Sequence, residues 1–124
     1  MALYTDLPIY HKTYELLSLI VASIKHFPRD LKFSLGDRLR NECVDLVVFI
    51  YKANSNRNKV PHLQEILDRI QVIQLLTRLA KDLQCLSIKK FSEISMSIQS
   101  LSKQTNGWLK SQPINKQIEQ NGVC

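Results

Sequence analysis

The stretch FPRDLKFSLGDRLR, residues 27–40, separates two long segments of periodic apolar residues, and so decides where one helix ends and the next begins. Pro28 interrupts a helix, because it lacks a backbone N–H and its ring crowds the preceding turn. Ser34, with Asp37 three residues later, resembles a capping box, in which Asp replaces the usual Glu. The stretch therefore predicts a short connection between two helices, and it is rich in basic residues for such a connection.

Working outward, apolar residues recur every three or four positions in four segments, which is the spacing of amphipathic helices. We expect helices over residues 7–26, 34–54, 60–86 and 88–111. Asp6 and Ser87 are expected to cap the first and fourth helices, and Pro8 and Pro61 suit first helical turns. The predicted core positions are Ile9, Thr13, Leu16, Ile20, Ile24, Phe27, Leu35, Leu39, Cys43, Leu46, Ile50, Ala53, Leu63, Ile66, Ile70, Ile73, Ala80, Ile88, Phe91, Ile94, Ile98, Leu101, Thr105 and Trp108.

Four such helices with short connections predict an all-α fold, an antiparallel up-down-up-down four-helix bundle. The length of 124 residues suits one domain, and 44% apolar residues suffice for a core. Only three glycines and four prolines argue against a turn-rich β fold. We place the bundle in residues 1–112. Residues 113–124 lack periodicity and are expected to form a flexible C-terminal tail.

The two middle helices are more apolar than one core requires. Each carries a second apolar stripe beside the first, whereas a bundle helix buries a stripe about 100° wide. A second stripe needs a second partner, so we expect a homo-oligomer; the alternative is that both helices are deeply buried within one chain. The second stripes are Val44, Val47, Val48 and Tyr51 in the second helix, and Val72, Leu76, Leu79, Leu83 and Leu86 in the third.

Basic residues gather where the first and third helices end and the second and fourth begin. The formal net charge is +6, which permits an anionic partner such as nucleic acid. Lys25 and Lys81 lie near predicted helix C-termini, where the helix dipole favours cations. Arg38, Lys89 and Lys90 are expected in first turns, where that explanation fails and an anion site is favoured. The alternative is a solvated, charged turn that keeps the protein soluble.

Several function classes lack the residues they require. The three cysteines are far apart, so neither a disulfide framework nor a zinc site is expected, and Cys43 is expected to be a small buried hydrophobe. A di-iron bundle needs Glu-x-x-His motifs, and the sequence offers only the reverse order, His62 to Glu65. We therefore expect no enzyme, no cofactor and no metal. The longest apolar run, residues 16–24, is too short to span a membrane, so we expect a cytoplasmic protein.

The Phe-Pro pair, the basic turn and the LGDRLR motif of residues 35–40 carry a resemblance to a known family. The sequence resembles the accessory variability determinant proteins of diversity-generating retroelements. These belong to a wider four-helix-bundle family named for proteins encoded by intervening sequences in 23S rRNA genes. That wider family shows an Ile-Ala-Glu-Gly run late in its second helix, where this chain has IYKANS at residues 50–55. The departure favours the retroelement branch.

The resemblance implies a pentameric, ring-like barrel that binds the retroelement reverse transcriptase and nucleic acid, without catalysis of its own. Template RNA is the expected nucleic acid, and DNA stays open. One alternative is a nucleic-acid-binding bundle of the intervening-sequence branch without a polymerase partner; another is a bundle that binds only protein. The residues expected to bind nucleic acid or polymerase are Arg29, Lys32, Arg38, Arg40, Lys89 and Lys90.

Overall fold

The computed structural model describes residue 3 and residues 6–113, and within these residues all regular structure is helical. Four long helices form the molecule: α1 (Pro8–Ile24), α3 (Asp37–Ser55), α4 (Val60–Asp82) and α5 (Ile88–Lys110). A short helix, α2 (Arg29–Leu31), precedes α3. The predicted tail lies outside the described residues, apart from Pro113.

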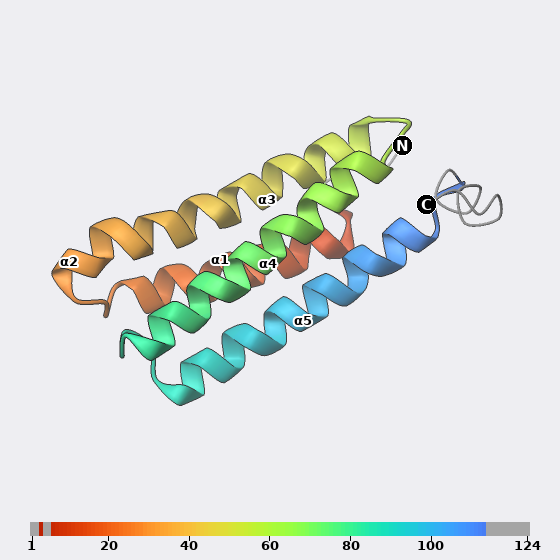
Figure 1. The fold of residues 1–124 in the computed structure, drawn as a ribbon. Coiled ribbons are helices and arrows are strands. Elements are labelled where there is room, and N and C mark those ends of the chain that lie inside the picture. The colour runs from red at the N-terminus through yellow and green to blue at the C-terminus, as the bar shows by residue number, and fades with distance from the viewer. Residues whose placement is uncertain (1–2, 4–5, 114–124) are drawn as a thin grey trace.

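The long helices form a four-helix bundle in which each helix packs against two neighbours. The packed pairs are α1 with α3, α3 with α4, α4 with α5, and α5 with α1, so that α3 and α5 occupy diagonal corners (Figure 1). Successive long helices run in opposite directions, and α1 begins where α5 ends (Figure 1). The up-down-up-down bundle predicted from the periodicity is therefore confirmed for the single chain.

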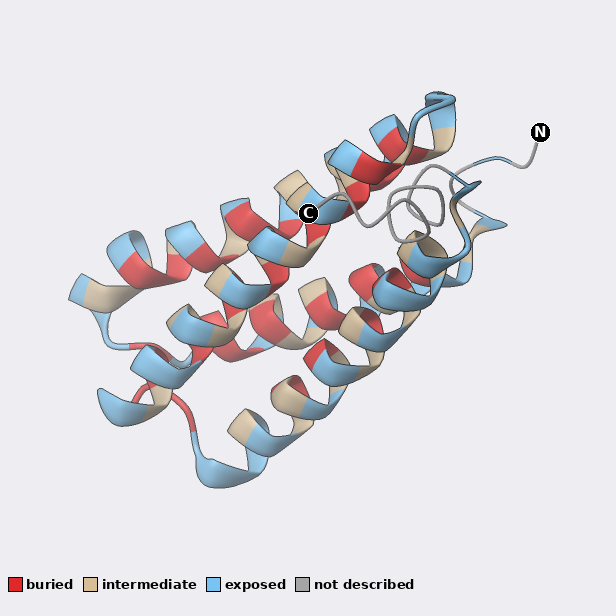
Figure 2. Ribbon diagram, turned by 45° about the vertical axis from the view of Figure 1, so that its right-hand side comes forward, coloured by how far each residue is buried: buried red, intermediate tan, exposed pale blue. Residues whose placement is uncertain are grey.

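The core follows the predicted stripes. Buried residues line the inward faces of all four helices and exposed residues the outward faces (Figure 2). Every predicted core position of the first three helices is buried, and Leu16, Cys43, Ile66 and Ile73 are fully enclosed. In α5, Phe91 and Trp108 are only half-buried, and Ile88 is 78% exposed, because it is the first residue of its helix and points away from the core.

The start of the second helical segment differs from the prediction. Helical backbone begins at Arg29, directly after Pro28, and a π-helical turn (Lys32–Gly36) joins α2 to α3 without a break. The predicted capping box is wrong, since Ser34 lies inside this segment and its hydroxyl donates to the Asp30 carbonyl at 3.0 Å. A hydroxyl that bonds back to the preceding turn does not cap a helix.

The π-helical turn is packed against the end of α1. Gly36 is buried, and a Cβ atom at this position would lie 2.9 Å from the Cγ2 atom of Ile24. Leu35 is buried beside it. A glycine is therefore needed here for close approach rather than for an unusual backbone angle, and the closeness fixes how α2 sits over the bundle.

The connection between α4 and α5 is built differently. Helix α4 ends at Asp82, four residues earlier than predicted, and Gln84 adopts a left-handed conformation with φ 64°. The amides of Gln84 and Cys85 donate to the carbonyls of Lys81 and Ala80, at 2.9 and 2.8 Å. This is a Schellman motif, which satisfies the last carbonyls of a helix. The predicted cap of α5 is confirmed, because the Ser87 hydroxyl accepts from the Lys90 amide at 3.1 Å.

The remaining helix ends use other means. Pro8 and Pro61 occupy first-turn positions as predicted, but α1 begins after Leu7 without a side-chain cap, so the expected Asp6 cap is wrong. The Lys59 ammonium donates to the carbonyls of Ala53, Asn54 and Asn56 and thereby satisfies the C-terminus of α3. None of the helices in the described part is long and apolar enough to cross a bilayer.

Most of the second apolar stripes face outward. Val44, Val48 and Tyr51 of α3 are exposed, as are Leu79 of α4 and Leu83 just after it. Val47, Val72 and Leu76 are half-buried, and Leu86 alone belongs to the core. The alternative explanation, deep burial of both helices within one chain, is therefore wrong for most of these residues.

Candidate nucleic-acid interface

The six basic residues expected to bind nucleic acid or polymerase lie toward one end of the bundle. We call it the basic end: the end where α1 and α4 finish and α2 and α5 begin (Figure 1). Arg29 and Lys32 lie on the segment that opens α3, and Arg38 and Arg40 on the following turns. Lys89 and Lys90 lie in the first turn of α5. The first four cations thus lie in or just after the connection from α1 to α3, and the last two lie just after the connection from α4 to α5.

Arg38 belongs to a charged network between α3 and α4. The carboxylate of Glu42 is buried, with 4% of the residue exposed. It accepts from Arg38 Nε at 2.9 Å and from Arg69 Nη1 at 3.0 and 3.3 Å. Hydrogen bonding to Glu42 raises the pKa of Arg69 above its usual value. Arg38 therefore has a structural partner, although its side chain stays 59% exposed and can still face a ligand.

Arg69 also contacts two residues other than Glu42. Its Nε donates to Glu65 at 3.2 Å, and its guanidinium lies 5.7 Å from the centre of the Phe49 ring. Since a buried carboxylate without partners is strongly destabilising, the two arginines offset the cost of burying Glu42. Spacing along the sequence is consistent with the local pairs, Arg38 with Glu42 and Glu65 with Arg69, but it does not show the link between Glu42 and Arg69, which are 27 residues apart.

Two more of the six cations are paired on the surface. Arg40 donates to Asp37 at 2.7 Å, and Lys90 to Glu93 at 3.2 Å. The side chains of both pairs are between a third and a half exposed, so each pair contributes at most about 1 kcal/mol. A phosphate group can replace such a partner at little cost, which leaves these cations available for binding.

Arg29, Lys32 and Lys89 form no ion pair with any residue of the described chain. Arg29 and Lys89 are exposed, and Lys32 is half-buried. Cations without protein partners are the ones whose counterions a polyanion releases on binding. Of the six, these three residues are therefore the ones that would lose no protein ion pair on meeting a phosphate.

The helix dipole separates the predicted residues further. Lys89 and Lys90 do lie in a first turn, as predicted, where no structural benefit from the dipole explains a cation. Arg38 also lies in the first turn of α3, as predicted, but helical backbone runs into that turn from Arg29, so the turn is not a free helix N-terminus. The charge of Arg38 is explained by Glu42 instead.

The sequence analysis missed Phe33, which is 69% exposed and directly follows Lys32. Its outward position becomes evident only once residues 29–36 are known to be helical. Two other aromatic residues lie elsewhere on the bundle: the rings of Tyr10 and Tyr14 contact each other in the first half of α1. Trp108 lies at the opposite end of the bundle.

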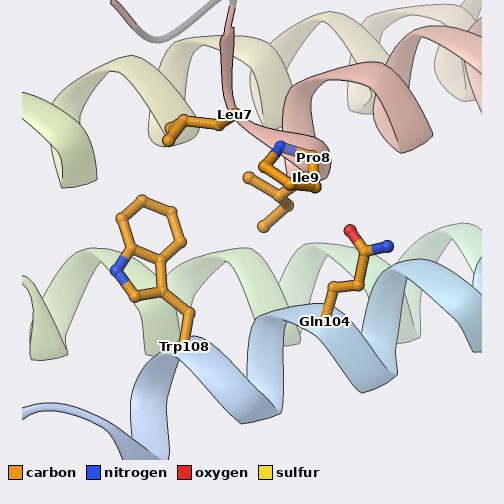
Figure 3. A pocket seen from close by; sticks show the side chains of 5 residues that line it. All are labelled: Leu7, Pro8, Ile9, Gln104 and Trp108. Atoms are coloured by element: carbon orange, nitrogen blue, oxygen red, sulfur yellow. The ribbon is translucent and has the colours of Figure 1, made fainter. Parts of the chain in front are cut away.

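An apolar pocket of about 400 Å3 opens at that opposite end. Figure 3 shows Trp108 and Gln104 rising from α5 toward Leu7, Pro8 and Ile9. The Oε1 atom of Gln104 is buried and accepts no hydrogen bond within the described part of the molecule. The pocket contains none of the six cations, so it belongs to a different surface from the basic end.

The described residues offer neither a metal site nor a reactive thiol. No group of three or more His, Cys, Asp or Glu side chains there could hold a metal ion. Cys43 is fully buried, as predicted, and burial, with a further contribution from Glu42, raises the pKa of its thiol to about 12. Burial and the Asp30 charge also raise the pKa of Cys85. Neither thiol is therefore present as a thiolate near neutral pH.

Comparison with known proteins identifies the family of this chain. A model of the bAvd-like family matches residues 7–112. The comparisons with curated proteins and with solved structures give no match. The matched range starts one residue before α1 and ends two residues after α5, so it covers the whole bundle and both connections of the basic end. The chain therefore belongs to the bAvd-like family, in agreement with its resemblance to accessory variability determinant proteins.

Proposed function

We propose that this protein is a non-catalytic accessory protein of a diversity-generating retroelement. In this role it binds the reverse transcriptase and its template RNA in the cytoplasm and supports mutagenic copying of that RNA. The observation that carries the proposal is the family match over the whole bundle. The basic end supports it, because three of its cations have no acidic partner in the described chain.

Assembly is the second part of the proposal. Copies of the chain form a ring-like homo-oligomer, for which the family resemblance implies five subunits. The support is the outward apolar residues of α3 and α4, namely Val44, Val48, Tyr51, Leu75 and Leu79. Val44, Val48 and Tyr51 recur at helical spacing along α3, and an exposed apolar stripe of this kind is typical of protein interfaces. A ring would multiply weak phosphate contacts into useful avidity.

The direct test is reconstitution with a reverse transcriptase of a diversity-generating retroelement taken from the same source as this protein. We expect the two proteins to copurify at moderate salt, and the chain to increase copying of the template RNA by that polymerase. Light scattering should give a mass of several chains. A monomer that neither copurifies with the polymerase nor changes its products would contradict the proposal and favour a bundle with a different protein partner.

A further inference from the structure

Phe33 has an unusual place for a large apolar side chain. It lies in the π-helical turn at the basic end with 69% of its surface exposed. No ring pair or cation–π contact in the described chain includes it. Two residues away on either side, Leu31 is half-buried and Leu35 is buried, so the turn itself holds the ring outward. Exposing a phenylalanine forfeits the roughly 1.5–3 kcal/mol that its burial would contribute.

The surroundings of Phe33 are cationic. Lys32 precedes it, and Arg29 lies four residues earlier, about one helical turn away. Neither cation has an ion-pair partner in the described chain, whereas the nearby Asp37 is neutralised by Arg40. Asp30, in α2, adds one carboxylate, so residues 29–33 keep a net positive charge. An exposed aromatic ring beside unpaired cations is the arrangement by which proteins hold unpaired nucleic acid, with phosphates on the cations and a base on the ring.

We infer that the basic end binds single-stranded rather than duplex nucleic acid, with the Phe33 ring stacking on an unpaired base and Arg29 and Lys32 contacting the adjoining phosphates. In a duplex the bases are already stacked and paired, so an outward ring reaches no base face unless a base is extruded, which costs a few kcal/mol. An unpaired strand offers its base faces freely. The inference rests on the proposed function, since it names the form of nucleic acid that the same surface takes.

The test compares two probes on the full chain: a 12-nucleotide single-stranded RNA and the duplex of the same sequence. Stacking on one base contributes enough for Phe33→Ala to weaken single-strand binding by about tenfold. Binding of the duplex should change by less than about twofold. Phe33→Leu should behave as Phe33→Ala does, because it keeps apolar volume without a π face, and Phe33→Trp should restore the affinity.

Tyr14→Leu is the matched control, because Tyr14 is also an exposed aromatic residue but lies in the first half of α1. It should leave both affinities unchanged. Equal losses for strand and duplex, or no loss with either, would overturn the inference while RNA binding itself stands. A wild-type chain that binds neither probe would overturn both the inference and the RNA-binding part of the proposed function.

The remaining explanation is that the Phe33 ring contacts another protein chain. Light scattering of the Phe33 variants tests this explanation. We expect the variants to keep the wild-type mass and to copurify with the reverse transcriptase as the wild type does. A fall in mass would make Phe33 a contact between subunits. Loss of the polymerase with unchanged RNA affinity would make it a polymerase contact. Either result would overturn the inference.

Discussion

Each of the two connections at the basic end joins two consecutive long helices, but one connection is packed against the bundle and the other is a surface loop. The connection from α1 to α3 is packed into the bundle: helix resumes one residue after Pro28, and Gly36 is pressed against Ile24. The connection from α4 to α5 is a surface loop closed by a Schellman motif and a serine cap. The packed connection leads into α3, where Arg38 binds the buried carboxylate of Glu42, whereas the loop leads into α5, where Lys90 pairs with Glu93 on the surface.

This difference predicts that mutations in and around the packed connection will cost far more stability than mutations in the loop. The largest effect is expected for Arg69→Leu, which removes the second partner of Glu42. We expect a loss of about 2–3 kcal/mol in the free energy of unfolding, because Arg38 alone must then compensate a buried carboxylate. Urea unfolding followed by circular dichroism measures the loss.

The double variant Glu42→Leu with Arg69→Leu is the control for that prediction. Replacing a buried ion pair by apolar residues is often neutral, so the double variant should recover most of the stability lost by Arg69→Leu. A double variant less stable than Arg69→Leu alone would contradict the account of Glu42 as a carboxylate that depends on its arginines.

The next largest effect concerns the close approach of the π-helical turn to α1. Gly36→Ala places a Cβ atom against Ile24, and overpacking of this kind costs about 1–3 kcal/mol. Alanine recovers part of that cost through its higher helix propensity, so the expected net loss is about 1–2 kcal/mol. Thermal unfolding measures it.

Gly107→Ala is the matched control, since no atom lies within 4 Å of a Cβ atom added there and the residue lies inside α5. It should stabilise the protein by about 0.5–1 kcal/mol. If both glycine variants stabilise the protein, the first connection is not tightly packed.

A smaller effect distinguishes the two serines that could cap helices. Ser87→Ala removes the cap of α5 and should cost about 1 kcal/mol. Ser34→Ala should be neutral or slightly stabilising, because its hydroxyl bonds to the preceding turn instead of capping. Equal costs for the two variants, measured by chemical unfolding, would restore the capping box and contradict the continuous helical segment from Arg29.

The smallest effect is expected at Gln84, which adopts a left-handed conformation that is unfavourable for residues with a Cβ atom. Gln84→Gly should raise the melting temperature slightly, by the equivalent of about 0.5–1 kcal/mol, because glycine is the usual residue at this position of a Schellman motif. A decrease would mean that the Gln84 side chain contributes contacts that outweigh its backbone cost.

These contrasts also show which features could be predicted from sequence. The four helices and the inward residues of α1, α3 and α4 follow from apolar periodicity, since each stripe is long and regular. The start of the second helical segment was mispredicted because Ser34 and Asp37 have capping-box spacing, and nothing local shows that Ser34 bonds to Asp30. The end of α4 was mispredicted because no glycine marks its left-handed residue.

The basic end could be predicted only in part. Sequence placed the six cations at one end, because helix order and direction determine which helix termini meet. It did not separate the paired cations from the unpaired ones, although the partners of Arg38, Arg40 and Lys90 lie only three or four residues away. The contact of Arg69 with Glu42, which are 27 residues apart, could not be read from local spacing. Sequence also missed Phe33, because whether that side chain points outward depends on the π-helical turn.

The central claim is that unpaired cations of the basic end bind RNA. Fluorescence anisotropy of labelled RNA over a salt series tests it most directly, with the triple variant Arg29→Glu, Lys32→Glu and Lys89→Glu. Its control is Arg57→Glu, Lys103→Glu and Lys110→Glu, which changes the net charge equally on exposed residues away from the basic end.

We expect the wild type and the control to bind with an affinity that falls steeply with salt. The basic-end variant should lose most of its affinity, and its salt slope should fall by about two, as expected for three lost phosphate contacts on a single strand. Equal weakening of both variants would show that only net charge matters, and unchanged binding by the basic-end variant would contradict the claim.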